Sequence, residues 1–468
     1  MYPISLQDLV NLTQATATSG VPLSSSCDGA VIHSRDAREG DLFFALQGEK
    51  FHGLDFAAEA TADGAVAVVT EDLVGVDDIP NAIIVPDAEI ALAELAHYNR
   101  RQSDALIVGI TGTVGKTTTR RLINSVLETG FTGIQSPNNF NNHLGVPLSL
   151  LELQEGDEYG VIEVATSISG DIQALSAITR PEMAVVTRVT PVHFSGFSSL
   201  KAVQQEKQQL VASLDHDGIA FLNADDPMVM QMADVCSGQV ISYGFSEQAD
   251  VRITDFEQLV DGIQLTVNGI DYEVPLMGRH LASNVAAAIA VGLETGLSTD
   301  QIADGLRRFQ NMPGRQQLQQ IGDWSVIDDS YNSSPASVVA AIDCVQSYQH
   351  CKHRVMILND MLDLGDQSQD LHFGIGATLA HSSVEHIVVL GEFAPDVVEG
   401  FQSAGGHQSR ISEFKSIDHF MSMADCLLSP GDAVLVKGSR GTVMENVVSQ
   451  LANLAAVQHT APSIRDAA

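Results

Sequence analysis

The stretch ALIVGITGTVGKTTTRRLINSVLETG, from Ala105 to Gly130, constrains the fold of this chain more than any other. Its opening run, ALIVGI, is short, apolar and rich in β-branched residues, which is typical of a buried parallel strand. The segment TTTRRLINSVLETG has helical spacing and ends in a glycine. The order of strand, glycine-rich turn and helix predicts a phosphate-binding loop, because backbone N–H groups and the helix N-terminus then face an anion.

Two side chains of the loop fit this interpretation. Lys116 can reach the β and γ phosphates of a nucleotide, and the Thr117 hydroxyl can bind Mg²⁺. Five residues separate Gly109 from Gly115, whereas the general pattern has about four, so the loop is a variant. A glycine-rich turn can also be only a tight connection, but the Lys-Thr-Thr that follows Gly115 favours nucleotide binding.

Composition limits the class of protein. A chain of 468 residues is long enough for about three domains of ordinary size. Its 24 Lys and Arg against 59 Asp and Glu give a net charge of −35, which repels nucleic acid and anionic membranes. The five cysteines form no CxxC pair, which favours reduced thiols in a cytoplasm. We find no signal peptide and no run long enough to span a membrane.

Alternating apolar runs and helical segments predict three α/β domains, at residues 1–103, 104–312 and 313–468. In the central part the runs indicate a mainly parallel sheet, followed between Asp250 and Leu276 by an antiparallel meander. The Pro-Gly within RRFQNMPGRQQ marks the second boundary. The last domain has a dinucleotide-type pattern but lacks GxGxxG, so no NAD site is predicted.

Two residues follow strands of the central domain. Glu163 closes the run YGVIEVA, and His193 comes after MAVVTRV. The carboxyl ends of parallel strands border the ligand crevice, where a carboxylate can hold Mg²⁺. The alternatives are a helix-capping acid and a hydrogen-bonded loop histidine.

Three other segments hold polar residues that can have either a functional or a purely structural role. Lys207 lies in the polar helix KAVQQEKQQLVASL, where the structural alternative is a solvated lysine. For the asparagines of SPNNFNNHLG, the structural alternative is an asparagine-rich turn with no further role. The cluster from Asp328 to Asn332 ends a strand of the last domain, where it can hold a ribose or cap the next helix.

Taken together, these segments resemble a known family, the Mur ligases. The ordered blocks are GITGTVGKTTT, NNFNNHLGVPLSLL, the Glu163 strand, VHFSGFSSLKAVQQEK, LNADD, NMPGR, DDSYNSSP and VKGSR, and SRDAREGDLFFALQGEKFHGLDFAAEA extends the similarity into the first domain. The resemblance covers nearly the whole chain. It implies an N-terminal domain for a UDP-linked substrate, a central ATPase domain, and a Rossmann-like C-terminal domain that closes over the nucleotide.

The resemblance also implies roles for individual residues. ATP is expected at ten positions: Gly112, Thr113, Gly115, Lys116, Thr117, Thr118, Asn284, Arg315, Asp329 and Asn332. Two Mg²⁺ ions are expected at Thr117, Glu163 and His193. Catalytic roles fall to Lys116, His193 and Lys207, and Lys207 lies where the family carries a carbamylated lysine. The substrate is expected at five positions: Ser34, Arg35, Asn141, Asn142 and His143.

The activity implied is ATP-dependent amide formation through an acyl phosphate, in cytoplasmic synthesis of peptidoglycan precursors by a monomer. D-alanyl-D-alanine would be joined to a UDP-N-acetylmuramoyl-tripeptide. The sequence lacks the Asp-Asn-Pro-Arg motif of the branch that adds diaminopimelate or lysine, which favours the dipeptide-adding branch.

The sequence departs from the family pattern near the substrate, at Val114, Ala165 to Ile168, Arg188, Leu281, Ser334 and Gly441. These changes leave open a ligase of the same type with another amine acceptor. A non-catalytic nucleotide-binding scaffold is a further alternative. It predicts erosion of the metal residues, whereas Thr117, Glu163, His193 and Lys207 are all present.

Overall fold

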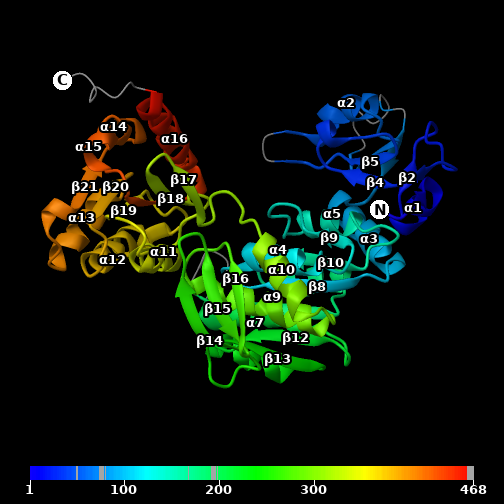
Figure 1. Ribbon diagram of the computed structural model, residues 1–468. Helices are drawn as coiled ribbons and strands as arrows, with labels where there is room; N and C mark the ends of the chain where they lie inside the picture. Colours follow the sequence, from blue (N-terminus) through cyan, green and yellow to red (C-terminus); the bar gives the residue numbers. More distant parts are fainter. Residues whose placement is uncertain are drawn as a thin grey trace.

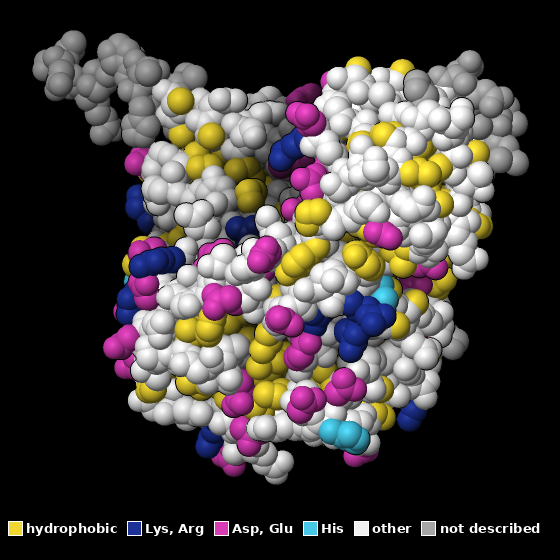
Figure 2. All heavy atoms as spheres, turned by 90° about the vertical axis from the view of Figure 1, so that its right-hand side faces the viewer, with side chains coloured by type: hydrophobic (Ala, Val, Ile, Leu, Met, Phe, Trp, Pro, Cys, Tyr) yellow, Lys and Arg dark blue, Asp and Glu magenta, His cyan; other side chains and the backbone are white. Residues whose placement is uncertain are grey.

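The computed structural model describes residues 1–48, 51–72, 79, 81–166, 168–190, 197 and 199–460, with side chains to residue 456. Figure 1 shows three units, with the first (blue) and the third (orange to red) on opposite sides above the central one (green). Figure 2 shows Asp and Glu side chains scattered over one face, with Lys and Arg confined to a few places. Within the described residues, no helix is long and apolar enough to cross a membrane.

The first unit is a small α/β layer built on a sheet of order β2-β7-β6-β5-β4, in which only β2 runs antiparallel to its neighbour. A separate pair, β1 and β3, lies beside it. The elements are β1 (Ile4–Ser5), α1 (Leu6–Leu12), β2 (Thr16–Ala17), β3 (Ser26–Cys27), β4 (Gly29–Val31), β5 (Asp41–Phe44), α2 (Ala57–Ala62), β6 (Ala67–Thr70), β7 (Ala82–Ile84) and α3 (Ala88–Gln102). The long helix α3 leads into the central unit.

The central unit alternates strands and helices as the sequence predicts. Its elements are β8 (Leu106–Thr111), α4 (Lys116–Leu127), β9 (Gly133–Gln135), α5 (Gly145–Leu151), β10 (Tyr159–Glu163), α6 (Asp171–Thr179), β11 (Met183–Val186), α7 (Leu200–Ala212), β12 (Ile219–Asn223), α8 (Pro227–Met230), β13 (Gln239–Gly244), β14 (Val251–Gln258), β15 (Ile263–Val267), β16 (Ile270–Val274), α9 (Ala282–Glu294) and α10 (Thr299–Arg308).

The central sheet has the order β16-β15-β14-β13-β12-β11-β8-β10-β9. It is parallel from β9 to β14, and the predicted meander, β14 to β16, extends its edge with antiparallel strands. Strand β8 lies between β10 and β11, so their carboxyl ends form one edge. Successive strand residues face opposite layers: Ile107 belongs to the core that contains α3, α5, α6 and α7, whereas Val108 belongs to the core that contains α4, α9 and α10.

The third unit has a sheet of order β17-β18-β22-β19-β20-β21, parallel except for the edge strand β17. Its elements are β17 (Gln317–Ile321), β18 (Trp324–Asp329), α11 (Pro335–Ser347), β19 (Arg354–Leu358), α12 (Ser368–Ala380), β20 (His386–Leu390), α13 (Ala394–Ser403), β21 (Ile411–Phe414), α14 (Ile417–Met421), α15 (Ala424–Leu427), β22 (Ala433–Lys437) and α16 (Glu445–Thr460). The predicted α/β class, with a mainly parallel central sheet and a Rossmann-like last unit, is confirmed.

The packing of the three units differs. One apolar core runs without a break from Leu6 and Phe44 of the first unit, through α3, to Ile162 and Leu210 under the central sheet. The third unit has two cores, one on each face of its sheet, and Met277 of the central unit packs into one of them. The first unit therefore shares an extended core with the central one, whereas the third is joined to it through the segment from Phe309 to Gln316 and a smaller contact around Met277.

Candidate active site

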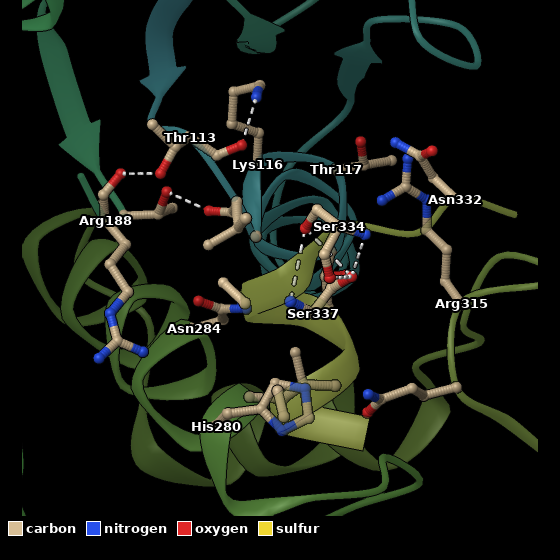
Figure 3. Close-up of a pocket in the computed structure, with 18 of the residues that line it drawn as sticks. Thr113, Lys116, Thr117, Arg188, His280, Asn284, Arg315, Asn332, Ser334 and Ser337 are labelled. Carbon is tan, nitrogen blue, oxygen red and sulfur yellow. Dashed lines mark hydrogen bonds between the residues drawn. The ribbon is translucent and has the colours of Figure 1, made fainter. Parts of the chain in front are cut away.

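A pocket of about 390 Å³ lies between the central and third units. It is bordered by the phosphate loop, the carboxyl ends of β10 and β11, the start of α9 and the first residues after β18. Eleven of the residues predicted from the sequence line it: Thr113, Gly115, Lys116, Thr117, Thr118, Asn141, Glu163, Asn284, Arg315, Asp329 and Asn332. In Figure 3, Thr117 lies beside Arg315 and Asn332 on the right, and Lys116 and Asn284 lie further to the left.

Two glycines give the phosphate loop its shape. Gly112 and Gly115 have φ angles of 149° and 86°, a region that L-residues rarely adopt. A Cβ at Gly112 would lie 1.9 Å from Thr187 Oγ1, and one at Gly115 would lie 3.1 Å from the Asn284 amide. The loop therefore needs glycine at both positions, and it places the N-terminus of α4 toward the pocket.

Lys116 is folded back onto its own loop. Its Nζ donates to the carbonyl oxygens of Gly112 at 2.9 Å and Thr113 at 3.4 Å. Burial lowers the pKa of Lys116, while Glu163 opposes this effect and Arg315 adds to it. Both acceptors are carbonyl oxygens of the loop, and the N–H groups of the same loop can bind an anion. When an anion enters the loop, the ammonium can therefore leave these carbonyl oxygens and pair with the anion.

Glu163 lies at the end of β10 and is only 1% exposed. Its carboxylate accepts hydrogen bonds from Thr117 Oγ1 at 3.0 Å and from Asn141 Nδ2 at 2.8 Å. The acid is thus held by side chains of the phosphate helix and the asparagine-rich loop, rather than as a helix cap. Within the described ranges there is no group of three or more His, Cys, Asp or Glu that could hold a metal. His193, the other predicted ligand, lies outside the described residues.

Arg120 is a site residue that the sequence analysis missed. It lies on α4, is 2% exposed, and donates through Nη1 to the carbonyl oxygens of Ser136 and Asn138. Burial lowers the pKa of Arg120 to about 10, although Glu163 opposes this shift. The guanidinium fastens the asparagine-rich loop to the phosphate helix. Its only sequence signal is a charged residue on the apolar side of that helix.

The three residues predicted as substrate-binding in the asparagine-rich loop lie in different places. Asn141 reaches Glu163 in the pocket. Asn142 accepts the backbone N–H of Gly145 at 2.9 Å and so begins α5, which is the turn-forming alternative. His143 is exposed and lies 3.6 Å from Glu89 of α3, away from the pocket lining.

Lys207 lies on the inner side of α7 and is 4% exposed, so the solvated-lysine alternative is wrong. Among the residues that the structure describes, its ammonium has no hydrogen-bond or ion-pair partner. Burial lowers the pKa of Lys207 to about 7, with a further contribution from Lys116 that Glu206 opposes. A large share of this side chain is therefore a neutral amine at neutral pH.

The third unit contributes a buried ion pair. Lys437 Nζ donates to Asp329 Oδ2 at 2.6 Å and to the carbonyl oxygen of Asn332 at 2.9 Å. Burial raises the pKa of Asp329, and Lys437 opposes that shift. Lys437 was not predicted, although it ends the strand of the VKGSR block.

Arg315 lies in the segment that joins the central and third units. Its guanidinium carbon lies 4.3 Å from the centre of the Tyr331 ring, and its buried Nε has no hydrogen-bond partner among the described residues. Figure 3 shows the side chain reaching toward Thr117 and Asn332. A cation whose Nε donor is unpaired within the described residues therefore lies in the pocket near the phosphate loop.

His280 lines the pocket and was not singled out by the sequence analysis. Burial lowers the pKa of His280 to about 4, and Lys437 and Arg188 add to the effect. The imidazole is therefore neutral at physiological pH. Figure 3 places it below Asn284, where it can exchange hydrogen bonds with an uncharged part of a ligand.

Two of the departures from the family pattern have a structural reason. Ser334 is the N-cap of α11: its Oγ accepts the Ser337 N–H at 3.4 Å within a capping box. At Gly441 a Cβ would lie 2.8 Å from Leu362 Cδ1, so Leu362 occupies the space of a larger side chain. Nothing in the structure explains why Arg188 stands where it does.

The first unit holds the two remaining predicted residues. Ser34 is 7% exposed and donates to Glu59 Oε2 at 2.5 Å. Arg35, beside it in a 3₁₀ turn, is exposed. Neither lines the pocket.

A glycine-rich loop at the carboxyl edge of a parallel sheet, covered by a second α/β unit, defines a phosphate-loop nucleotide-binding protein. Comparison with family models assigns the chain more narrowly. Residues 28–100 match the Mur ligase family catalytic domain, residues 110–292 the Mur ligase middle domain, and residues 307–440 the Mur ligase glutamate ligase domain. The chain belongs to the Mur ligase family.

Individual relatives match over nearly their whole length. The UDP-N-acetylmuramoyl-tripeptide–D-alanyl-D-alanine ligase of Bacillus subtilis (strain 168) is 30% identical, covering 96% of this chain and 99% of the relative. That of Synechocystis sp. (strain ATCC 27184 / PCC 6803 / Kazusa) is 32% identical, covering 96% and 97%.

Solved structures agree with this assignment. A crystal structure of MurF from Acinetobacter baumannii has a TM-score of 0.87 at 28% identity and covers 96% of this chain and 99% of that one. The MurF ligase of Thermotoga maritima in complex with ADP has a TM-score of 0.80 at 25% identity, covering 92% and 98%.

Proposed function

We propose that this chain joins D-alanyl-D-alanine to a UDP-N-acetylmuramoyl-tripeptide in an ATP-dependent reaction, as the named relatives do. The observation that carries the proposal is the cluster of Lys116, Thr117 and Glu163 in the lining of the pocket between two units. This cluster suits a nucleotide whose γ-phosphate points toward a second substrate. The relatives of the same name match over nearly the full chain.

The reaction forms one amide bond and cleaves one phosphoanhydride bond. A carboxylate oxygen of the tripeptide attacks the γ-phosphorus, ADP leaves, and an acyl phosphate forms. The amine of the dipeptide then attacks the acyl carbon, loses a proton and expels phosphate. Lys116 is expected to leave its loop carbonyls for the phosphates, and Arg315 to face them from the third unit. Closure of that unit would keep water from the acyl phosphate.

The residues present fit Mg²⁺. The Thr117 hydroxyl and the Glu163 carboxylate lie 3.0 Å apart, with the Asn141 amide beside them, and hard oxygen ligands are what this ion prefers. We propose two such sites, at Thr117 and Glu163, with His193 as a further ligand. Bound Mg²⁺ neutralises charge on the phosphates.

We propose that Lys207 is carbamylated. Its neutral amine nitrogen would bond to the carbon of CO₂ and lose a proton, which turns a buried base into a carboxylate-like group. The low pKa of Lys207, about 7, supports this step because only the neutral amine reacts. Such a group could orient the metal beside Lys116.

The remaining assignments rest on the resemblance. Ser34 and Arg35 are proposed for the UDP part, and Asn141, Asn142 and His143 for substrate binding. Asn284, Asp329 and Asn332 are proposed for the adenosine part. We place the domains at residues 1–103, 104–312 and 313–468, and propose a cytoplasmic monomer.

Phosphate release from ATP tests the assignment, with each substrate omitted in turn and the product identified by mass. We expect release only with both the muramoyl-tripeptide and D-alanyl-D-alanine. ATP turnover without the tripeptide would contradict the proposal. The altered segment from Ala165 to Ile168 favours one other candidate, a ligase with a different amine acceptor, and competition within a panel of amino acids and dipeptides separates the two.

A further inference from the structure

Glu206 is a buried carboxylate that the proposed reaction does not use. It lies on α7 directly before Lys207 and is 5% exposed. Its Oε2 accepts the backbone N–H of Gly170 at 2.8 Å, and its Oε1 accepts that of Ile172, also at 2.8 Å. The Ser169 hydroxyl donates to Oε2 at 3.4 Å. Both oxygens are therefore engaged by a single short segment.

This segment is the start of α6. The N–H groups at a helix N-terminus lack partners within the helix, and a carboxylate there also meets the positive end of the helix dipole. The chain reaches this point directly from β10, whose last residue is Glu163. A single side chain of α7 thus fastens the end of the loop that leaves Glu163.

The far end of α6 is fastened as well. Arg100 of α3 donates through Nε to the carbonyl oxygen of Thr179 at 3.0 Å and through Nη2 to that of Arg180 at 3.1 Å. It also pairs with Glu182 at 2.5 Å. Helix α6 is therefore held at both termini by charged side chains, and it cannot slide along α7 without breaking one set of bonds.

We propose that Glu206 is a positioning residue of this ligase, which holds the loop leaving Glu163 against the helix that carries Lys207. The inference rests on the proposed function. Glu206 acts through its neighbours: Glu163 and Lys207 come from different elements, and the bonds from Glu206 to the start of α6 keep the two elements in register. The placement of Mg²⁺ between them depends on that register.

Glutamate is the side chain that this position requires. Two converging N–H groups need two acceptor oxygens, which the carboxylate supplies. Glutamine would turn an NH₂ toward one of them, and alanine would leave both without a partner. The conservative variant therefore keeps the volume and loses half of the attachment.

The test compares Glu206→Ala and Glu206→Gln with Ser298→Ala. Ser298 caps α10 through its Oγ, which accepts the Gln301 N–H at 3.3 Å, and it does not line the pocket. Residues that orient metal ligands typically change metal affinity or activity by about 10–100-fold. We expect a rise of that size in the Mg²⁺ concentration that half-saturates binding of a fluorescent ATP analogue, with a smaller rise for Glu206→Gln and none for Ser298→Ala.

Two further measurements separate positioning from simple capping. With ¹³C-bicarbonate, the carbamate signal of Lys207 should persist in the Glu206 variants, while kcat with both substrates falls. Unchanged Mg²⁺ half-saturation and kcat in both folded Glu206 variants, with only a lowered Tm as in Ser298→Ala, would overturn the inference. If Glu206→Ala does not fold, Glu206→Gln alone decides. Because nucleotide binding is measured without the tripeptide, the result holds even where the wild-type chain fails to use that substrate, and such a failure would count against the proposed function alone.

Discussion

Lys437 and Asp329 stand opposite each other on the neighbouring parallel strands β22 and β18, joined by a 2.6 Å bond in the buried wall of the pocket. Breaking one half of a buried pair leaves an uncompensated charge, which typically costs about 3–5 kcal/mol. We expect Lys437→Met to lower the free energy of unfolding of the third unit by this amount in urea titrations.

The double variant Lys437→Met with Asp329→Asn should recover most of that loss, because neither charge then remains. Nucleotide affinity is expected to be lower in the double variant than in the wild-type chain, since the predicted contact of the Asp329 carboxylate with the nucleotide is lost. A single Lys437→Met variant as stable as wild type would contradict the prediction.

The glycines of the phosphate loop can be tested against a matched position. Gly115 and Gly269 have nearly equal φ angles, 86° and 83°, but only Gly115 has neighbours that a Cβ would meet. Alanine should therefore cost similar backbone strain at both, on the order of 1–3 kcal/mol. Only Gly115→Ala should also weaken ATP binding, as measured by calorimetry, because its methyl group meets Asn284. Equal ATP affinity in the two variants would show that the loop tolerates the side chain.

Two threonines of α4 make a second matched pair. Thr117 Oγ1 donates to Glu163, whereas the buried Thr119 Oγ1 has no partner among the described residues. Thr117→Val should reduce kcat/KM by about 10-fold or more, since side chains that bind a metal or orient its ligands typically contribute that much. Thr119→Val should leave activity intact and change stability by about 1 kcal/mol or less in the favourable direction. Similar kinetics for both variants would remove Thr117 from the site.

The buried Lys207 predicts a pH-dependent stability. Its pKa falls from 10.5 to about 7 on folding, so between these values the unfolded chain binds more protons and stability rises with pH. In CO₂-free buffer Lys207→Met should therefore be more stable than wild type, by on the order of a few kcal/mol below pH 7 and by less as the pH approaches 10. The same variant should be nearly inactive.

Added bicarbonate supplies the control for that experiment. It should raise the Tm of the wild-type chain at pH 8 and leave Lys207→Met unchanged, because only the lysine can form a carbamate. A bicarbonate effect of equal size in both proteins would point to another site.

The sequence predicted elements best where local pattern and burial agree. The run ALIVGI became β8, and the alternating residues after Asp250 became three antiparallel strands. Strand β17 has no sequence signal, because its residues, QLQQI, pair on one side only at a sheet edge and include one buried apolar residue, Ile321. Edge strands of this kind carry no apolar run to detect.

The residues of the candidate site also differ in how well the sequence predicts them. The phosphate loop could be predicted because its chemistry is contiguous in sequence. Arg120 and Lys437 could not be predicted, because folding brings their partners to them. Arg120 donates to the carbonyl oxygen of Ser136, 16 residues away, and Lys437 donates to the carboxylate of Asp329, 108 residues away. Lys207 shows the limit of the local pattern most clearly, because its polar helix gave no indication that this lysine faces inward and only the family resemblance singled it out.

The core that runs from the first unit into the central one has a thermodynamic consequence. Asn99 of α3 donates to the carbonyl oxygens of Leu150 at 2.9 Å and Leu153 at 3.0 Å, and it accepts the N–H of Tyr2 at 2.7 Å. Melting the first unit alone would remove α3 from α5 and α6 of the central unit and expose their apolar side chains to water. Scanning calorimetry should therefore resolve two cooperative transitions rather than three, one for the first and central units together and one for the third unit. Saturating nucleotide should raise the Tm of both transitions, because the central and third units both line the pocket.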